Sequence, residues 1–267
     1  MASDTPLSHI DTSVAHAARV YDYWLGGKDN FAADRALGDA MVQAIPTLKT
    51  MARANRDFLG RAVRYLATEE GIRQFLDIGT GIPTSGSVHE VAQAVAPESR
   101  VLYVDHDPLV LAHARALMTG TSQGRTEFIM ADLREPEGIL TDPTLAKTLD
   151  LDQPVALMLV AILMYFHDDE NPHAWVSTLL DALPPGSYLA VAHPTGDFDP
   201  EATQAAVDAA TRAGITLVPR SKAGVESFFA GLELIEPGVV PLLSWHPDDT
   251  GADPRSVWYY GGVGRKP

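Results

Sequence analysis

From residue 73 onward, short apolar runs alternate with stretches of helical periodicity, and this alternation limits the possible folds to a small set. The predicted strands cover residues 74–78, 101–105, 127–131, 155–160 and 188–192, and the predicted helices between them cover 85–95, 108–118, 142–149 and 171–183. Strands that alternate with helices form βαβ units with parallel strands. Val155–Phe166 is apolar at all twelve positions, which is typical of a central strand covered on both faces.

The pattern changes after residue 197. Two helical stretches, Pro200–Ala213 and Lys222–Gly231, separate the parallel part from two late β-rich segments, Leu232–Ile235 and Val257–Val263. Two late strands after five strand–helix units favour a closing hairpin. We therefore predict an α/β, doubly wound sheet of about seven strands, mostly parallel, with an antiparallel C-terminal edge hairpin.

Residues 1–71 are predicted to form a helical extension packed on the α/β domain of residues 72–267, and no linker separates the two parts. A first helix has Val14, Tyr21 and Trp24 on one apolar face, with Thr12 or Ser13 as its cap and Gly26-Gly27 at its end. A second helix is predicted at 34–44 and a third at 47–68. The apolar face of the third helix includes Asn55, whose amide either holds the extension in place or faces a ligand.

Composition restricts the partners of this chain. Its 267 residues, 46% of them hydrophobic, suffice for one large core. The formal net charge of -15 repels phosphate polyanions, so we expect no nucleic-acid partner. The densest basic cluster lies on the third helix, where its spacing suits a solvated face or one carboxylate-binding arginine. It consists of Lys49, Arg53, Arg56, Arg61 and Arg64.

The chain contains no cysteine, which excludes disulfides, cysteine-ligated metals and thiol nucleophiles. Residues 1–12 lack the basic start and apolar stretch of a secretory signal. The longest apolar run, twelve residues, is too short to span a bilayer. We therefore expect a cytoplasmic protein with no membrane partner, while the oligomeric state stays open.

The sharpest local motif is Phe75–Gly81, where an apolar strand leads into Asp77 and then into Gly79, Thr80 and Gly81. Glycines allow a tight turn and bring bare backbone against a ligand. A helix is predicted to follow, and its first turn would present unpaired N–H groups.

Further aspartates stand at the ends of the next two predicted strands. Asp105 lies 24 residues after Gly81, and Asp132 ends the third strand. Because the carboxyl ends of parallel strands open onto one crevice, Asp77, Asp105 and Asp132 should line the same slot. A carboxylate at the second position can accept both hydroxyls of an adenosine ribose. The expected cofactor-binding set also contains the neighbouring residues His106, Leu133 and Ala161.

This arrangement resembles the Rossmann-like class I S-adenosylmethionine-dependent methyltransferases. The resemblance covers residues 72–265 and implies S-adenosyl-L-methionine as the cofactor. It implies that Asp77 serves the methionine end, Gly79–Gly81 pass beneath the cofactor, Asp105 holds the ribose, and Asp132 and Leu133 meet the adenine. One departure is that Ile82-Pro83-Thr84 replaces the usual third glycine, which stiffens the turn.

A narrower resemblance rests on Arg19–Phe31, which is similar to the signature of an actinobacterial S-adenosyl-methyltransferase family, long filed as a domain of unknown function. Four further segments fit the same family: Arg53–Leu59, Phe75–Thr84, Pro185–Leu189 and Gly261–Lys266. The resemblance implies a cofactor-binding fold and gives no acceptor.

The segment Tyr21–Phe31 is interpreted as a lid over the methionine end of the cofactor, because methyl transfer gains from the exclusion of water. Tyr21 and Trp24 would anchor it, and the alternative is a packed helix with a glycine cap. The lid and substrate candidates are Arg19, Tyr21, Tyr23, Lys28, Asn30, Asn55 and Arg56.

Catalysis of methyl transfer mainly requires orientation of the acceptor, and a general base helps only for a hydroxyl or amine acceptor. His193, at a predicted strand end, is the first choice for such a base. We predict no metal, because His167 and His173 are six residues apart, which is not a zincin spacing.

The favoured function is methyl transfer to a small-molecule acceptor. One alternative is a catalytically silent protein that binds S-adenosylmethionine or a metabolite and regulates a partner. A less favoured alternative is an NAD-dependent oxidoreductase, whose G-x-G-x-x-G/A motif would require glycine or alanine where Thr84 stands.

Overall fold

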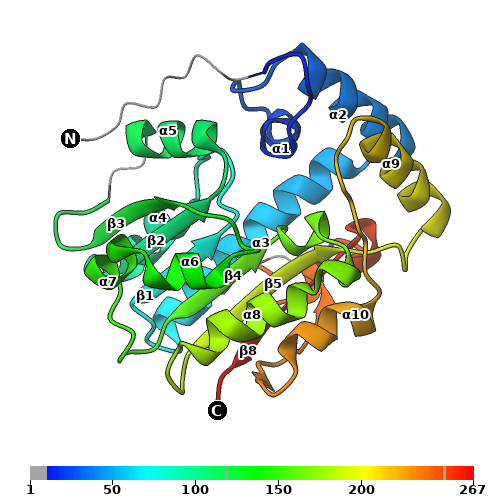
Figure 1. The fold of residues 1–267 in the computed structure, drawn as a ribbon. Helices are drawn as coiled ribbons and strands as arrows, with labels where there is room; N and C mark the ends of the chain where they lie inside the picture. Colours follow the sequence, from blue (N-terminus) through cyan, green and yellow to red (C-terminus); the bar gives the residue numbers. More distant parts are fainter. Residues whose placement is uncertain (1–10, 118–119, 249–250) are drawn as a thin grey trace.

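A computed structural model describes residues 11–117, 120–248 and 251–267. Its centre is a single mixed sheet with the strand order β3-β2-β1-β4-β5-β8-β6, and β7 pairs with β8 (Figure 1). The first five strands are parallel, and β8 runs antiparallel to β5, β6 and β7. The prediction of a mostly parallel sheet with an antiparallel C-terminal edge is confirmed. The strand bounds are β1 Gln74–Ile78, β2 Arg100–Asp105, β3 Arg125–Met130, β4 Ala156–Val160, β5 Tyr188–Pro194, β6 Glu233–Leu234, β7 Val240–Pro241 and β8 Tyr259–Arg265.

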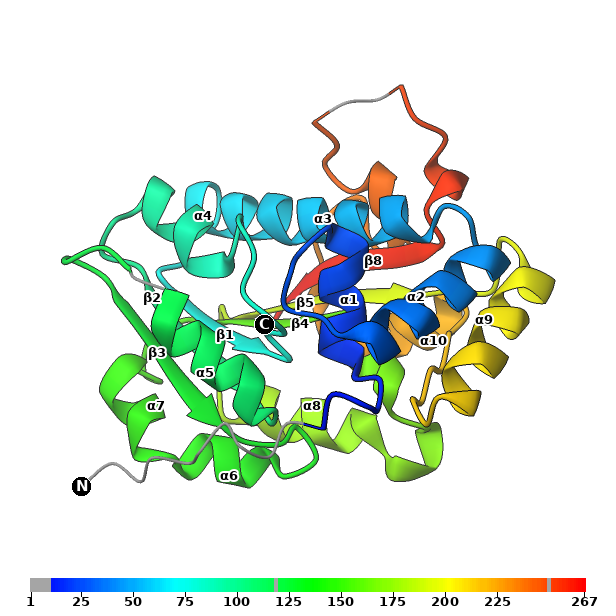
Figure 2. The same ribbon diagram turned by 90° about the horizontal axis from the view of Figure 1, so that it is seen from above.

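Helices cover both faces of this sheet. In Figure 2, α3 (Leu48–Thr68) and α4 (Val88–Val95) lie on one side of the strands, and α6 (Pro136–Thr141) and α8 (Pro172–Asp181) lie on the other. Successive residues of β4 enter two different cores: Ala156 and Met158 face one, and Leu157 and Leu159 face the other. All four side chains are fully buried, as the apolar run of this strand predicts.

The N-terminal helices are built into the core on the α3 side. α1 (Ala17–Leu25) packs on α2 (Ala32–Ala44) and on α3, while α2 also packs on α9 (Pro200–Arg212). Gly26 ends α1 in the left-handed conformation at φ 83°, as predicted. The predicted cap is wrong, because α1 begins after His16, and the Ser13 hydroxyl binds Asp11 instead.

Several other boundaries differ from the prediction. α6 was missed, and α7 (Pro143–Thr148) follows it directly; a proline occupies the first turn of each helix. α5 (Pro108–Leu117) begins as predicted, and its predicted end at Met118 lies outside the described residues. α10 (Lys222–Glu226) is shorter than predicted, because residues 227–229 form a 3₁₀ turn. No helix within the described ranges combines the length and apolar character that crossing a bilayer requires.

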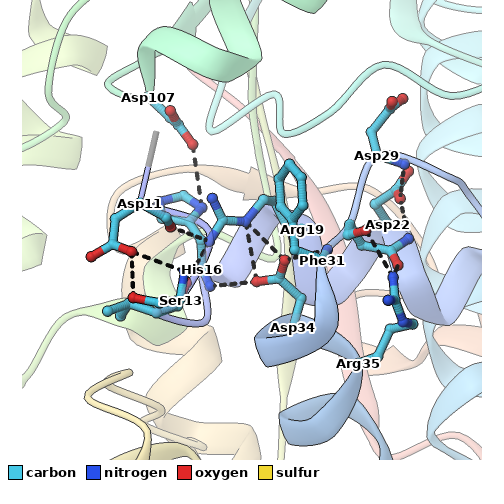
Figure 3. A network of polar contacts seen from close by, with 12 residues as sticks. Asp11, Ser13, His16, Arg19, Asp22, Asp29, Phe31, Asp34, Arg35 and Asp107 are labelled. Carbon is cyan, nitrogen blue, oxygen red and sulfur yellow. Dashed lines mark hydrogen bonds and ion pairs between the residues drawn. The ribbon is translucent and has the colours of Figure 1, made fainter. Parts of the chain in front are cut away.

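A buried ion pair holds α1 against the start of α2. Asp34 is fully buried, and its carboxylate accepts hydrogen bonds from Arg19 Nε and from the backbone N–H groups of His16 and Phe31. Figure 3 shows the contacts of Arg19 with Asp34, whereas Asp107 is joined to His16. The second Arg19 nitrogen, Nη2, donates to the carbonyl oxygens of Asp11 and Val14. The Asp34 carboxylate thus binds both the residue before α1 and the residue before α2.

We expect Asp34→Ala to lower the free energy of unfolding by about 3–5 kcal/mol, because it leaves the Arg19 guanidinium buried without its counter-charge. Urea denaturation measures this loss. The matched control is Asp39→Ala on the same helix, which removes only an exposed hydrogen bond from the Tyr23 hydroxyl and should cost under about 1.5 kcal/mol. Equal losses in the two variants would contradict the assignment.

Candidate functional site

A cavity of about 510 Å³ opens at the carboxyl ends of the parallel strands. Its wall combines the loops after β1, β2, β3 and β4 with residues of α1 and α3. All the residues expected to bind cofactor lie on this wall: Asp77, Gly79, Thr80, Gly81, Asp105, His106, Asp132, Leu133 and Ala161. We call this space the cofactor cavity.

The glycine loop after β1 requires its glycines for two reasons. Gly79 and Gly81 have φ of 78° and 66°, in the left-handed region that other residues rarely occupy. A Cβ atom on Gly79 would come within 2.6 Å of the Ile162 side chain, so the β1 and β4 loops pack directly against each other. The chain then continues through Ile82 and Thr84 as a loop, and α4 begins only at Val88 rather than near Ser85.

Asp105 links the loops of β1 and β2. Its Oδ2 accepts a hydrogen bond of 2.9 Å from the Gly81 N–H, and its Oδ1 accepts one of 3.0 Å from the Asp107 N–H. Each carboxylate oxygen has a second lone pair, so Asp105 can still accept bonds from a ligand in the cavity. The geometry supports the predicted position of this residue beside the glycine loop.

Asp77 lies at the base of the cofactor cavity. Burial raises the pKa of its carboxyl from 3.8 to about 7; the nearby Arg56 lowers the pKa, and Asp105 raises it. No described residue donates a hydrogen bond to this carboxylate. Such a group gains most from a ligand that supplies both a positive charge and donor hydrogens.

Unpaired polar atoms lie next to Asp77 on the wall formed by α3. Asn55 Nδ2 donates to the Tyr21 hydroxyl over 2.8 Å, and that hydroxyl donates to the Ala52 carbonyl oxygen over 3.0 Å. Asn55 Oδ1 and Arg56 Nε are buried and have no hydrogen-bond partner among the described residues. Buried polar groups are normally paired, so their position on the cavity wall indicates a polar ligand.

Asp132 has a different environment at the end of β3. Its carboxylate accepts hydrogen bonds from Arg134 N, Nε and Nη2, the last over 2.6 Å. These bonds lower the pKa of Asp132 and keep the carboxylate ionised. The adjacent backbone N–H of Leu133 donates no hydrogen bond to any described residue, so this corner offers one acceptor and one donor to a ligand.

The prediction of His193 as a general base is wrong on geometry. Its side chain is fully buried and is not part of the cavity wall. Nδ1–H donates to the Pro194 carbonyl oxygen, and Nε2 accepts from Arg220 Nη1, each over 2.8 Å. Burial lowers the pKa of His193 to about 3, so the ring stays neutral and has no free nitrogen for a substrate proton.

The lid candidates divide into two groups. Tyr21, Asn55 and Arg56 line the cofactor cavity. The other four do not, because each is directed elsewhere. Arg19 is held by Asp34, the Tyr23 hydroxyl donates to Asp39, Asn30 Nδ2 donates to Asp22, and Lys28 is exposed.

Sequence reasoning missed part of the wall. His16, whose Nδ1 lies 3.3 Å from Asp107 Oδ2, reaches the cavity from the start of α1. Tyr165 and Phe166 come from the loop after β4, which the apolar run could have indicated. Residues 214–216 come from the segment after α9, and no pattern in the sequence connects them with the cavity.

Asp77→Asn should raise the melting temperature of the ligand-free protein, with a gain that grows between pH 4 and 7 and then levels off. In the folded protein Asp77 keeps its proton up to about pH 7, whereas in the unfolded chain it loses the proton near 3.8. Ionisation therefore favours unfolding across this window, by up to about 4 kcal/mol at about 1.4 kcal/mol per pKa unit.

Calorimetry at several pH values measures this gain. Asp132→Asn is the control: the lowered pKa of Asp132 means that its ionisation stabilises the folded protein, so removing the charge should give no gain. A gain for Asp77→Asn that does not vary with pH would contradict the assignment of its carboxyl.

Comparisons with known proteins add to this geometry. The profile of a family described as S-adenosyl methyltransferase matches residues 3–267. A search of curated proteins found no match.

Two similar crystal structures cover nearly the whole chain. One is a DUF574 family protein from Streptomyces avermitilis, 48% identical over 96% of this chain and 99% of that one, with a TM-score of 0.94. The other is a protein from Thermobifida fusca whose name assigns it as a methyltransferase, 41% identical over 99% of both chains, with a TM-score of 0.89. These sources agree with the actinobacterial family that the sequence resembles.

A more distant structure, human N-acetylserotonin methyltransferase in complex with S-adenosylmethionine, is 16% identical. It covers 92% of this chain and 62% of its own, with a TM-score of 0.50. At this identity the likeness concerns the fold alone.

Proposed function

Because this chain belongs to the S-adenosyl methyltransferase family, we propose that it transfers a methyl group from S-adenosyl-L-methionine to a small-molecule acceptor. The observation that carries the proposal is the set of unsatisfied polar groups in one cavity. The Asp77 carboxylate, Asn55 Oδ1 and Arg56 Nε all lack hydrogen-bond partners among the described residues, and all three residues line that space.

The charges of these residues fit the amino-acid end of the cofactor. Arg56 would pair with the α-carboxylate, since its guanidinium forms no ion pair with any described residue. Asp77 would accept hydrogen bonds from the ammonium group, which would also favour the charged form of this carboxyl.

The adenosine end would lie against the loops after β2 and β3. Asp105 would hold the ribose hydroxyls through its remaining lone pairs. Asp132 and the free N–H of Leu133 would receive the adenine, whose edge carries an amino donor and ring-nitrogen acceptors. His106 and Ala161 would complete the wall.

A bound sulfonium supplies an electrophilic methyl group, so the chain needs no nucleophile of its own. Its residues act by orienting the two reactants and by excluding water. α1 contributes Ala17, Tyr21 and Leu25 to the cavity wall, and two contacts tie its flanking segments to α5 and to the residue before it. These are His16 to Asp107 and Asp29 to His113, at 3.3 and 3.8 Å.

Two ligands test the two ends of the site independently. Arg56→Met should weaken binding of S-adenosylhomocysteine about tenfold or more and leave binding of methylthioadenosine, which lacks the amino-acid group, unchanged. Asp105→Ala should weaken both ligands by roughly 1–3 kcal/mol, because ribose hydroxyls lose their acceptor.

Isothermal titration calorimetry of the folded variants provides the measurement. If Arg56→Met weakened both ligands equally, the assignment of the carboxylate would be wrong. If the parent protein bound NAD and neither adenosyl ligand, the proposed cofactor would be wrong.

Turnover is tested with S-adenosylmethionine that carries a radiolabelled methyl group. We expect label to enter a low-molecular-weight fraction of cell extract with the parent protein, and much more slowly with Asp105→Ala. Tight cofactor binding without labelling of any extract would instead support the regulatory alternative.

A further inference from the structure

A second, smaller cavity of about 60 Å³ lies between the N-terminal helices and α9. Figures 1 and 2 both show α2 and α9 side by side at this place. Its walls include Trp24, Met41, Met51, Met164 and Trp258, and none of the described residues that line it has a charged side chain. We call this space the apolar chamber.

The hydroxyls of both threonines on the chamber wall are already engaged. The Thr195 hydroxyl accepts a hydrogen bond from the Asp197 N–H, and the Thr203 hydroxyl donates to the Asp199 carbonyl oxygen over 2.7 Å. A charged group placed here would lose its hydration without gaining a counter-charge. A water molecule would find few partners, although the volume exceeds the 10–15 Å³ or so that one water needs.

The chamber adjoins the cofactor cavity. Ala17, Tyr165 and Ile215 line both spaces. Tyr21 lines the cofactor cavity and Tyr259 lines the chamber, and burial raises the pKa of both hydroxyls and of Tyr165, so all three stay neutral. The junction is therefore uncharged, whereas the rest of the cofactor cavity carries Asp77, Asp105 and Asp132.

We propose that the apolar chamber binds the apolar part of the methyl acceptor, an uncharged small molecule with a short aliphatic group. The inference rests on the proposed methyl transfer. An acceptor lone pair would form the bond to the methyl carbon, the electron pair of the carbon–sulfur bond would stay on sulfur, and the acceptor proton would leave to water. The acceptor would lie across the junction, with its reacting atom toward the cofactor cavity.

The size of the chamber restricts this aliphatic group. A dry cavity of roughly 150 Å³ holds benzene. At about 60 Å³ the chamber is too small for an aromatic ring. It takes only the end of a short chain, whose remaining carbons and polar atom would lie across the junction with the cofactor cavity. Met41, Met51 and Met164 can adjust to its shape, because methionine side chains are unbranched and flexible.

The test uses protein labelled with ¹³C at the methionine methyl groups and saturated with S-adenosylhomocysteine. 1-Butanol should shift the signals of Met41, Met51 and Met164 saturably. The signals of Met130, which is exposed, and of Met158, in the sheet core, should stay unchanged. Butylammonium, of the same chain length but charged, should shift none of them. Shifts that do not saturate, or that butylammonium reproduces, would overturn the proposal.

Three variants test whether the alcohol binds in the chamber. Ala210→Leu fills the chamber from α9 and should weaken 1-butanol binding about tenfold or more. Ala205→Leu, on the exposed side of the same helix, should change nothing. If Ala210→Leu fails to fold, Leu37→Ala, which enlarges the chamber, should shift the preference from 1-butanol to benzyl alcohol.

The two proposals fail in different ways. Loss of S-adenosylhomocysteine binding in the parent protein would contradict the proposed function. Suppose that S-adenosylhomocysteine binding is intact and that neither Ala210→Leu nor Leu37→Ala changes alcohol binding. This result would contradict only the role of the chamber, which would then be a packing void.

Discussion

Burying a carboxylate that accepts no hydrogen bond costs free energy. Asp77, near the end of β1, is such a residue in the described part of the chain. Burial raises its pKa to about 7, and the positive charge of Arg56 on α3 partly offsets this rise. Both residues face one cavity, and Arg56 Nε is itself unpaired among the described residues. The site thus combines an acidic and a basic group that a zwitterionic ligand can satisfy together. The methyltransferase family provides such a ligand in its cofactor.

The architecture explains how distant segments reach this cavity. Parallel pairing brings the ends of β1, β2, β3 and β4 to one edge of the sheet, and the 2.9 Å hydrogen bond from Gly81 N to Asp105 joins two of their loops. α1 covers the same edge, and the buried pair of Arg19 and Asp34 holds it there. α1 lines both the cofactor cavity and the apolar chamber, so a charged cavity and an uncharged one adjoin at this helix.

The sequence predicted the features that depend on local periodicity. The apolar runs located β1, β2 and β4 to within one residue, and the aspartates at the strand ends located the cofactor cavity. Features that depend on tertiary contacts could not be predicted from periodicity. His193 looks available at a strand end, but Arg220, 27 residues later, occupies its Nε2.

The prediction of lid residues was limited in the same way, because it also depends on tertiary contacts. Helical spacing placed Tyr21 on the apolar face of α1, but it could not tell which side chains of this helix meet the cavity. In the structure Arg19 donates a hydrogen bond to Asp34, and the Tyr23 hydroxyl donates one to Asp39. α6 was missed because six residues are too few to show a period.

A crystal structure of the protein with S-adenosylhomocysteine tests the central claim most directly. The account predicts the ligand carboxylate at Arg56, its ammonium group at Asp77 and its ribose hydroxyls at Asp105. A ligand bound elsewhere, or bound in the cavity while Asp77 and Arg56 stay unpaired, would contradict it.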